Sequence, residues 1–322
     1  ARKYWQQKSK ASPEQKRYGR NEFVCESKAM RAVVENVKLI ARSPIPVLLE
    51  GESGTGKEMI ARLIYQEGGY EGKPFVGINC AAIPSGLLES ELFGHDKGSF
   101  SGAHKTKIGK FESAGDGVLF LDEIGDMNIE LQAKLLRALE EKSYERIGGL
   151  KAIPLQARVV SSTNVDLRKQ VEDGSFRSDL YFRLKGVQIY IPPLREREED
   201  IEALAYAFLD HYQAIYEKPG LELSAEAVRK LRKYGWPGNV RELKYVMESA
   251  VLLAGSKDKI LSEDLPIENV GSPSAVSVNE IEKSTIINAL VENHFNRSLA
   301  AQSLQISRKT LYSKMKKYSI EA

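Results

Sequence analysis

Hydrophobic and polar residues follow two alternating patterns between Asn21 and about Pro192. Short apolar runs are typical of buried strands, and longer stretches with an apolar residue every three or four positions are typical of helices. Their alternation predicts an α/β fold, a parallel sheet flanked by helices. The expected strands are Val47–Leu49, Phe75–Ile78, Val118–Leu121, Val159–Ser162 and Val187–Ile191. The expected helices include Ala29–Ala41, Glu58–Gln66, Leu87–Phe93, Ile129–Glu141 and Leu167–Glu172.

The strand pattern ends at Pro192-Pro193, and only helical periodicity follows. Helices are expected at Asp200–Tyr216, Ala225–Tyr234 and Val240–Leu253, which together predict a small all-helical domain. A Gly/Ser/Pro-containing stretch then indicates a linker before a last helical unit. The predicted division is a basic linker at 1–20, an α/β subdomain at 21–193, a helical lid at 194–269, a linker at 270–279 and a helical unit at 280–322.

Length and composition place limits on the class of protein. The chain has 322 residues, of which 42 % are apolar, enough for two or three domains with cores of their own. Its two cysteines, Cys25 and Cys80, lack metal-ligand spacing, and no apolar run approaches the roughly 20 residues of a membrane helix. We therefore expect a cytoplasmic protein without a structural metal and without membrane contact.

The formal net charge of +3 is unevenly distributed. Residues 1–20 carry +6 and residues 280–322 carry +3, which leaves −6 for the middle of the chain. We expect the first stretch to be a linker that follows an upstream segment. The basic C-terminal stretch indicates a nucleic-acid partner.

The sequence GESGTGKE at residues 51–58 lies between an expected strand and an expected helix and predicts a phosphate-binding loop. Its glycines allow successive N–H groups to point into one concavity, and its lysine adds a cation at the helix start. A Gly-rich surface turn is the alternative. The eighth position usually supplies a hydroxyl to Mg²⁺, and here it is a glutamate. The predicted binding residues are Gly51, Glu52, Ser53, Gly54, Thr55, Gly56, Lys57 and Glu58.

A second candidate element is the apolar strand that begins at Gly117 and ends in two acids, Asp122 and Glu123. Carboxylates at the C-terminal edge of a sheet that also carries a phosphate loop are suited to handling Mg²⁺ and an attacking water. Asp122 is the predicted metal ligand, directly or through water, and Glu123 is predicted to polarise the water. Taken alone, such a strand could equally be an ordinary one that leaves the core.

The segment Gly98, Ser99, Phe100, Ser101, Gly102 and Ala103 is an excursion that a simple phosphate-loop fold does not need. Glycines near both ends can act as hinges, and Phe100 is an aromatic anchor suited to a protein partner. We call residues 98–103 the output loop. A generic mobile surface loop is the alternative.

The last unit reads as a helix-turn-helix, with a first helix at 296–304, a turn at Gln305-Ile306 and a recognition helix at 307–317. Leu304, Ile306, Leu311 and Met315 would form its core. A plain basic hairpin is the alternative, and the small size of the unit makes dimerisation through 280–293 an expectation. The predicted DNA-binding residues are Ser307, Arg308, Lys309, Thr310, Tyr312, Lys314 and Lys316.

Together these residues resemble one family, the AAA+ activators of sigma-54-dependent transcription, also called bacterial enhancer-binding proteins. The resemblance covers about residues 21–322, and the last unit is similar to the Fis-type domain of that family. Glutamate is common at the eighth loop position there, so Glu58 does not argue against ATP. The most specific stretches are GESGTGKE at 51–58, ELFGHDKGSFSGA at 91–103, LFLDEIGDM at 119–127, FRSDLYFRL at 176–184 and GWPGNVRELK at 235–244.

The resemblance implies roles for five further residues. Asn79 would pair with the catalytic glutamate, Glu123, as a switch that senses the nucleotide, and Asn164 would be the first sensor. Arg241 would be the second sensor, which ties the lid to ATP. Arg177 and Arg183 would reach the neighbouring subunit's site and stabilise charge on the transferred phosphoryl group. For Arg177 an ion pair with Asp179 is the local alternative.

The resemblance also implies a function: an ATP-hydrolysing transcription activator that assembles as a hexameric or heptameric ring. It would bind upstream enhancer DNA, remodel the closed complex of sigma-54 RNA polymerase through the output loop, and answer to a two-component or other signal. In the family that loop usually reads GAFTGA, and here Ser99 and Ser101 replace Ala and Thr. Two rivals remain open: an AAA+ remodeller of another class, and a DNA-bound regulator that senses nucleotide without hydrolysing it.

Overall fold

The computed structural model describes residues 24–267 apart from 256 and, nearer the C-terminus, residues 286, 289–290, 297–304 and 307–317. Two compact units, 1–267 and 268–322, are distinguished by their contacts, and each is described by itself. The predicted linkers at 1–20 and 270–279 and the predicted turn at Gln305-Ile306 lie outside the described residues, as does most of the 280–293 segment. Within the described residues no helix is long and apolar enough to cross a membrane.

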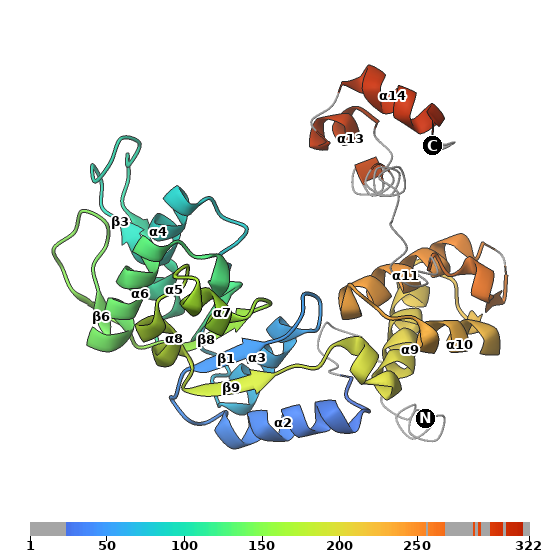
Figure 1. Ribbon diagram of the computed structural model, residues 1–322, viewed down its shortest axis with the longest axis horizontal. Coiled ribbons are helices and arrows are strands. Elements are labelled where there is room, and N and C mark those ends of the chain that lie inside the picture. Colours follow the sequence, from blue (N-terminus) through green and yellow to red (C-terminus); the bar gives the residue numbers. More distant parts are fainter. Residues whose placement is uncertain are drawn as a thin grey trace. The chain divides into compact units, whose positions relative to one another are not determined.

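The centre of the larger unit is a five-stranded parallel sheet with the strand order β2-β5-β8-β1-β9. Figure 1 labels three of these strands, β8, β1 and β9. All five predicted strands are confirmed to within one or two residues, because each is an apolar run buried by helices. Their bounds are β1 Val47–Glu50, β2 Phe75–Asn79, β5 Val118–Asp122, β8 Arg158–Thr163 and β9 Val187–Tyr190.

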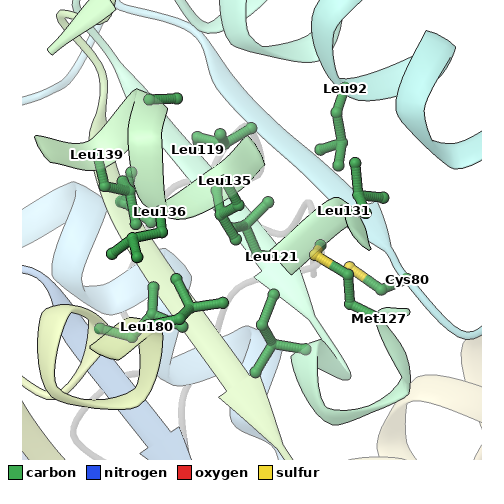
Figure 2. Packing of buried hydrophobic residues seen from close by; sticks show 14 of the residues in the cluster. Cys80, Leu92, Leu119, Leu121, Met127, Leu131, Leu135, Leu136, Leu139 and Leu180 are labelled. Carbon is green, nitrogen blue, oxygen red and sulfur yellow. The ribbon is translucent and has the colours of Figure 1, made fainter. Parts of the chain in front are cut away.

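Alternate residues of β5 face the two sides of the sheet, as the strand period requires. Leu119 and Leu121 pack with α4 and α6 in one core, whereas Val118 and Phe120 pack with α2 and α3 in another. Figure 2 shows the first of these cores, where leucines of α6 lie over β5. The bounds of the helices are α2 Lys28–Ile40, α3 Lys57–Glu67, α4 Ser85–Phe93 and α6 Ile129–Glu141.

Several short elements lie outside the five-stranded sheet and were only partly predicted. The predicted helix α7, Leu167–Glu172, is confirmed, but the pattern did not distinguish the two short helices α5, Lys110–Ala114, and α8, Ser178–Leu184. Two hairpins were also missed because their strands are only two residues long. They are β3 Gly94–His95 with β4 Lys107–Ile108, and β6 Ser143–Tyr144 with β7 Ile153–Pro154.

The lid is built from α9, Glu198–Ile215, α10, Ala225–Lys233, and α11, Asn239–Leu253. Its own core surrounds Trp236, which is fully buried and donates its indole N–H to the carbonyl of Leu231 at 2.8 Å. A two-stranded parallel sheet of β10, Glu222–Leu223, and β11, Lys259–Ile260, completes it. All three predicted lid helices are confirmed.

In the C-terminal unit, helices α13, Arg297–Ser303, and α14, Arg308–Lys317, pack against each other. Leu311 and Met315 are buried and Leu304 is partly buried, as predicted, and Ala300 and Ile286 join them. Ile306, the fourth predicted core residue, lies outside the described residues. The two helices confirm the helical pair that the sequence predicted.

Candidate functional site: a phosphate loop, two acids and a lid

The phosphate loop connects β1 to α3 and is shaped by its glycines. Gly54 and Gly56 have φ angles of 78° and 104°, which side chains rarely adopt, and Gly56 is the N-cap of α3. Lys57 is 6 % exposed, and its Nζ donates to the carbonyl oxygens of Gly51 at 2.9 Å and Glu52 at 3.4 Å. The loop thus folds around the ammonium group of Lys57. A bound phosphate would interact with the same ammonium group.

Asp122 is the last residue of β5, and both neighbouring strands fix its carboxylate. The amide of Asn79, its register partner on β2, donates to Oδ2 at 3.1 Å. On the other side, the fully buried Ser162 of β8 donates its hydroxyl to Oδ1. Ser162 was not among the predicted site residues, although it ends a predicted strand that lies beside β5.

The expected pairing of Asn79 with Glu123 is not made in this structure. The Asn79 amide is already engaged with Asp122, and its Oδ1 accepts the backbone N–H groups of Ala81 and Ala82. Glu123 instead lies 3.3 Å from the Lys57 ammonium and accepts the backbone N–H of Asn164 at 3.0 Å. The physical reason is that Asp122 stands directly opposite Asn79, whereas the chain turns away at Glu123.

That turn is a strained one. Glu123 has a φ of 51°, in the left-handed region that costs a residue with a side chain on the order of 1–3 kcal/mol. This backbone conformation directs the Glu123 carboxylate towards the phosphate loop, where it forms an ion pair with Lys57. Lys57, Asp122, Glu123, Asn79 and Asn164 therefore meet at the C-terminal edge of the sheet, where ligands bind in folds of this type.

Cys80 lies beneath these acids and is chemically quiet. Burial, followed by the charges of Asp122, Asp126 and Glu123, raises the pKa of its thiol to about 12. The group therefore stays protonated near neutral pH, and Cys80 serves as a small buried residue of the core.

The lid is fastened to the phosphate loop by side chains. Arg195 donates two hydrogen bonds to the Glu52 carboxylate, at 2.5 and 2.8 Å, and the fully buried Asn239 donates to Glu52 and to the carbonyl of Ser53. Arg241, the predicted second sensor, donates to the Ser53 hydroxyl at 3.0 Å. We call Glu52, Arg195 and Asn239 the lid clasp.

Main-chain contacts add to the clasp. The N–H of Val240 donates to the carbonyl of Gly54 at 3.0 Å. A Cβ at Gly54 would lie 2.4 Å from the carbonyl oxygen of Gly238, so only glycine permits this approach. The loop that holds phosphates and the first turn of α11 are therefore one hydrogen-bonded assembly.

The lid clasp predicts how acid affects stability. The Arg195 guanidinium, then Asn239, lowers the pKa of Glu52 from 4.5 to about 2. Because this pKa is depressed on folding, the clasp stabilises the protein fully above about pH 4.5 and is lost as the pH falls towards 2. We expect Glu52→Gln to lower the free energy of unfolding near pH 7 by about 0.5–1 kcal/mol, since the pair is partly exposed.

Urea unfolding between pH 7 and pH 2 measures this effect. In that series, the difference between wild type and Glu52→Gln should shrink at the acid end. Glu222→Gln is a matched control, because its carboxylate is exposed and lies 3.8 Å from the Lys259 ammonium. A constant difference at every pH would contradict the role given to the ionised Glu52.

Neither predicted catalytic arginine lies within its own chain's site. Arg177, the N-cap of α8, makes two hydrogen bonds to the Asp179 carboxylate, at 3.0 and 2.7 Å. Arg183 donates to the carbonyl of Leu139 at 2.8 Å. The local alternative for Arg177 is thus the state observed here, and both guanidinium groups remain substantially exposed.

The output loop is a tight turn between β3 and β4. The Gly98 N–H donates to the carbonyl of Ala103 at 2.8 Å, and Gly98 and Gly102 have φ angles of 85° and 116°. Phe100 is 43 % exposed and packs edge-on against His95, with ring centroids 5.0 Å apart. The loop therefore presents an aromatic ring to solvent while one edge stays on the protein.

In the C-terminal unit the start of α14 is capped by Ser307, whose hydroxyl accepts the Thr310 N–H at 3.0 Å. Tyr312 is partly exposed and lies under Arg297, with the guanidinium carbon 5.3 Å from the ring centroid. Arg308 and Lys314 also belong to α14, as do Lys309 and Lys316, whose side chains lie outside the described residues. The helix thus carries the cations that phosphate contact requires.

Comparison with known proteins gives these features a family. The sigma-54 interaction domain matches residues 23–190. The chain belongs to the sigma-54-dependent transcription activators. An AAA+ ATPase lid domain matches residues 195–280 of this activator, and the Fis family of bacterial regulatory proteins matches residues 277–318.

Relatives of this activator include the regulatory protein AtoC of Escherichia coli K12, 43 % identical over 92 % of this chain and 67 % of AtoC. The formate hydrogenlyase transcriptional activator FhlA of the same strain is 44 % identical, over 93 % of this chain and 44 % of FhlA. The response regulator PilR of Pseudomonas aeruginosa is 41 % identical, over 94 % of this chain and 70 % of PilR. The chain thus spans less than half of FhlA and about two thirds of the other two.

Solved structures agree with this assignment. NtrX from Brucella abortus, crystallised with ADP, has a TM-score of 0.71 at 29 % identity, over 93 % of this chain and 70 % of NtrX. Its complex with ATP gives a TM-score of 0.71 at 31 % identity, over 92 % of this chain and 69 % of NtrX. The α/β AAA+ fold with a helical lid and a C-terminal helix-turn-helix domain, predicted from sequence, is confirmed.

Proposed function

We propose that this activator hydrolyses ATP in a ring of subunits and uses the output loop to remodel sigma-54 RNA polymerase bound at a promoter. One observation supports the proposal most strongly. The same chain contains a nucleotide site and an exposed aromatic loop that takes no part in that site. Phe100 is exposed on that loop, while Lys57 and Glu123 face each other at the site. A regulator that only sensed nucleotide would not require a poised catalytic acid.

In the proposed mechanism the loop N–H groups and Lys57 bind the β- and γ-phosphates, which displaces the lysine from the loop carbonyls. Once phosphate neutralises Lys57, Glu123 is released from its ion pair and can accept a proton from the attacking water. Asn79 and Ser162 hold Asp122 in place during this step. Asn164 and Arg241 would report the nucleotide to the strand edge and the lid.

The residues fit a Mg²⁺ ion that accompanies ATP. Mg²⁺ in nucleotide sites takes one or two carboxylates, phosphate oxygens and water, and here Asp122 is a carboxylate oriented by two hydrogen bonds. Glu58, at the position of the usual hydroxyl, is paired with Arg62 at 2.7 Å. Bound Mg²⁺ would supply charge neutralisation for the transferred phosphoryl group.

A ring follows from the arginines. Since Arg177 and Arg183 bond away from their own site, they can serve phosphoryl transfer only from a neighbouring subunit, as the resemblance implies. Head-to-tail contacts of that kind can close into a ring, which the resemblance implies to be hexameric or heptameric. Upstream enhancer DNA would be bound by α14, which carries Arg308 and Lys314, with the C-terminal units as dimers.

The test is open-complex formation on a sigma-54 promoter with purified sigma-54 RNA polymerase, ATP and this chain. We expect open complexes only with hydrolysable ATP, and more of them when the template carries an upstream site for the C-terminal unit. A promoter of another sigma factor is the control. Open complexes that form equally without hydrolysis would favour the non-enzymatic regulator, and none at all would favour an AAA+ remodeller of another class.

A further inference from the structure

A buried glutamine connects the catalytic acids to the arginine segment. Gln132, on α6, is fully buried, and its side chain makes three hydrogen bonds to main-chain groups. Its Nε2 donates to the carbonyl oxygens of Met127, at 2.7 Å, and Ser175, at 3.0 Å. Its Oε1 accepts the N–H of Arg177 at 2.8 Å. The partners are two acceptors and one donor, so the orientation of the amide is unambiguous.

The three partners belong to two functional segments that are far apart in the chain. Met127 ends the short turn, Ile124–Asp126, that follows Asp122 and Glu123. Ser175 and Arg177 form the entry to α8. A buried amide satisfied by three backbone groups is a rigid link, because moving any one of them leaves polar groups without partners.

Arg177 is thereby held at two points. Gln132 fixes its backbone, and Asp179 holds its guanidinium through two hydrogen bonds. The Asp179 pair is partly exposed and can be exchanged for phosphate oxygens, whereas the part-buried hydrogen bond to Gln132 ends on a fully buried side chain and need not change. The Arg177 side chain can therefore change its conformation while its backbone stays in place.

We propose that Gln132 is a positioning residue. It fixes the position of the Arg177 backbone, from which the side chain extends to the ATP of the neighbouring subunit. This inference rests on the proposed function, since it needs a ring in which Arg177 acts across an interface. Catalysis by a charged group is sensitive to displacements of about 1 Å, which can cost roughly 100-fold in rate. A glutamine that fixes the backbone of the arginine thus contributes to hydrolysis without touching ATP.

The first test is Gln132→Met, which keeps the length of the side chain and removes all three hydrogen bonds. Alone, it should turn over ATP roughly 100-fold more slowly while its affinity for ADP is little changed. Its thermal midpoint should fall, because three main-chain groups lose their partner. A parallel loss of ADP affinity would mean that Gln132 supports its own site through Met127, and would overturn the proposal.

Mixed rings make the test specific. Glu123→Ala subunits have a dead site but an intact Arg177, so they can donate that arginine to the site of a Gln132→Met subunit. Random mixing at equal amounts pairs them at about a quarter of all interfaces, and turnover should rise to about a quarter of the wild-type rate. No recovery would show that the defect lies within the variant's own site, which overturns the proposal.

Arg177→Ala mixed with Glu123→Ala is the control that separates the two proposals. If this control recovers activity and the Gln132→Met mixture does not, only the role of Gln132 falls. If the control itself does not recover, Arg177 serves no neighbouring site, and the ring mechanism falls together with the inference.

A measurement on the wild-type chain covers the case in which Gln132→Met does not fold. The Arg177 amide hydrogen is bonded to a fully buried acceptor, so its exchange with deuterium should be strongly slowed. Exchange at the rate of an unprotected surface amide would show that Gln132 does not hold Arg177, and would overturn the proposal without any variant.

Discussion

Glu123→Ala is expected to bind ATP but to hydrolyse it roughly 10²–10⁴-fold more slowly than the wild type, the usual contribution of a positioned base. Glu123 is 14 % exposed and lies 3.3 Å from the Lys57 ammonium, so it faces the place where the γ-phosphate and the attacking water would meet. Its removal takes away the proton acceptor while Lys57 and the loop N–H groups stay. Binding and hydrolysis should therefore separate.

Steady-state phosphate release and equilibrium binding of a fluorescent ATP analogue measure the two properties. Lys57→Ala is the matched control, because it removes the cation that holds the phosphates and should lose binding as well as turnover. Glu123→Ala with wild-type turnover would exclude Glu123 as the base. Loss of binding comparable to that of Lys57→Ala would instead mean that the glutamate maintains the shape of the loop.

Phe100→Ala is expected to hydrolyse ATP at close to the wild-type rate but to form few or no open complexes. Removing an aromatic anchor from the centre of a contact typically costs about 2 kcal/mol or more, roughly a 30-fold loss of affinity. Phe100 is 43 % exposed, and its ring contacts His95 rather than any residue of the ATP site. The substitution should therefore abolish open-complex formation and leave ATP hydrolysis intact.

The measurement compares ATP turnover and open-complex formation for the same preparation. Tyr245→Ala is the control, since Tyr245 is an exposed aromatic residue on the lid, away from the output loop. It should behave as the wild type in both assays. Normal open-complex formation by Phe100→Ala would remove the output loop from its proposed role.

Much of the ATP site was predictable because a parallel sheet brings the ends of its strands to one edge. Asn79, Asp122 and Asn164 follow three apolar runs, so their meeting was a consequence of topology. The partner of Asn79 was not predictable, because Asp122 and Glu123 are adjacent acids and only the left-handed turn at Glu123 decides which one faces the amide.

Other features depend on contacts that no local pattern records. Glu52 and Asn239 are 187 positions apart in the chain, and the sequence gives no sign that they touch. Gln132 looked like an ordinary polar position of an amphipathic helix, although it is fully buried. Helix α8 was missed since it has only seven residues, two of them the charged Asp179 and Arg183, and its packing on α6 stabilises it.

The hydrogen bond from the Val240 N–H to the Gly54 carbonyl joins two main chains, so almost every side-chain replacement leaves it intact. A library of point mutants will therefore report the lid–loop connection through Glu52, Arg195 and Asn239 and will underestimate it. Only substitutions that change the backbone itself can reveal the contribution of this main-chain hydrogen bond. These are proline at Val240, which lacks the donor, and any side chain at Gly54, which would collide with Gly238.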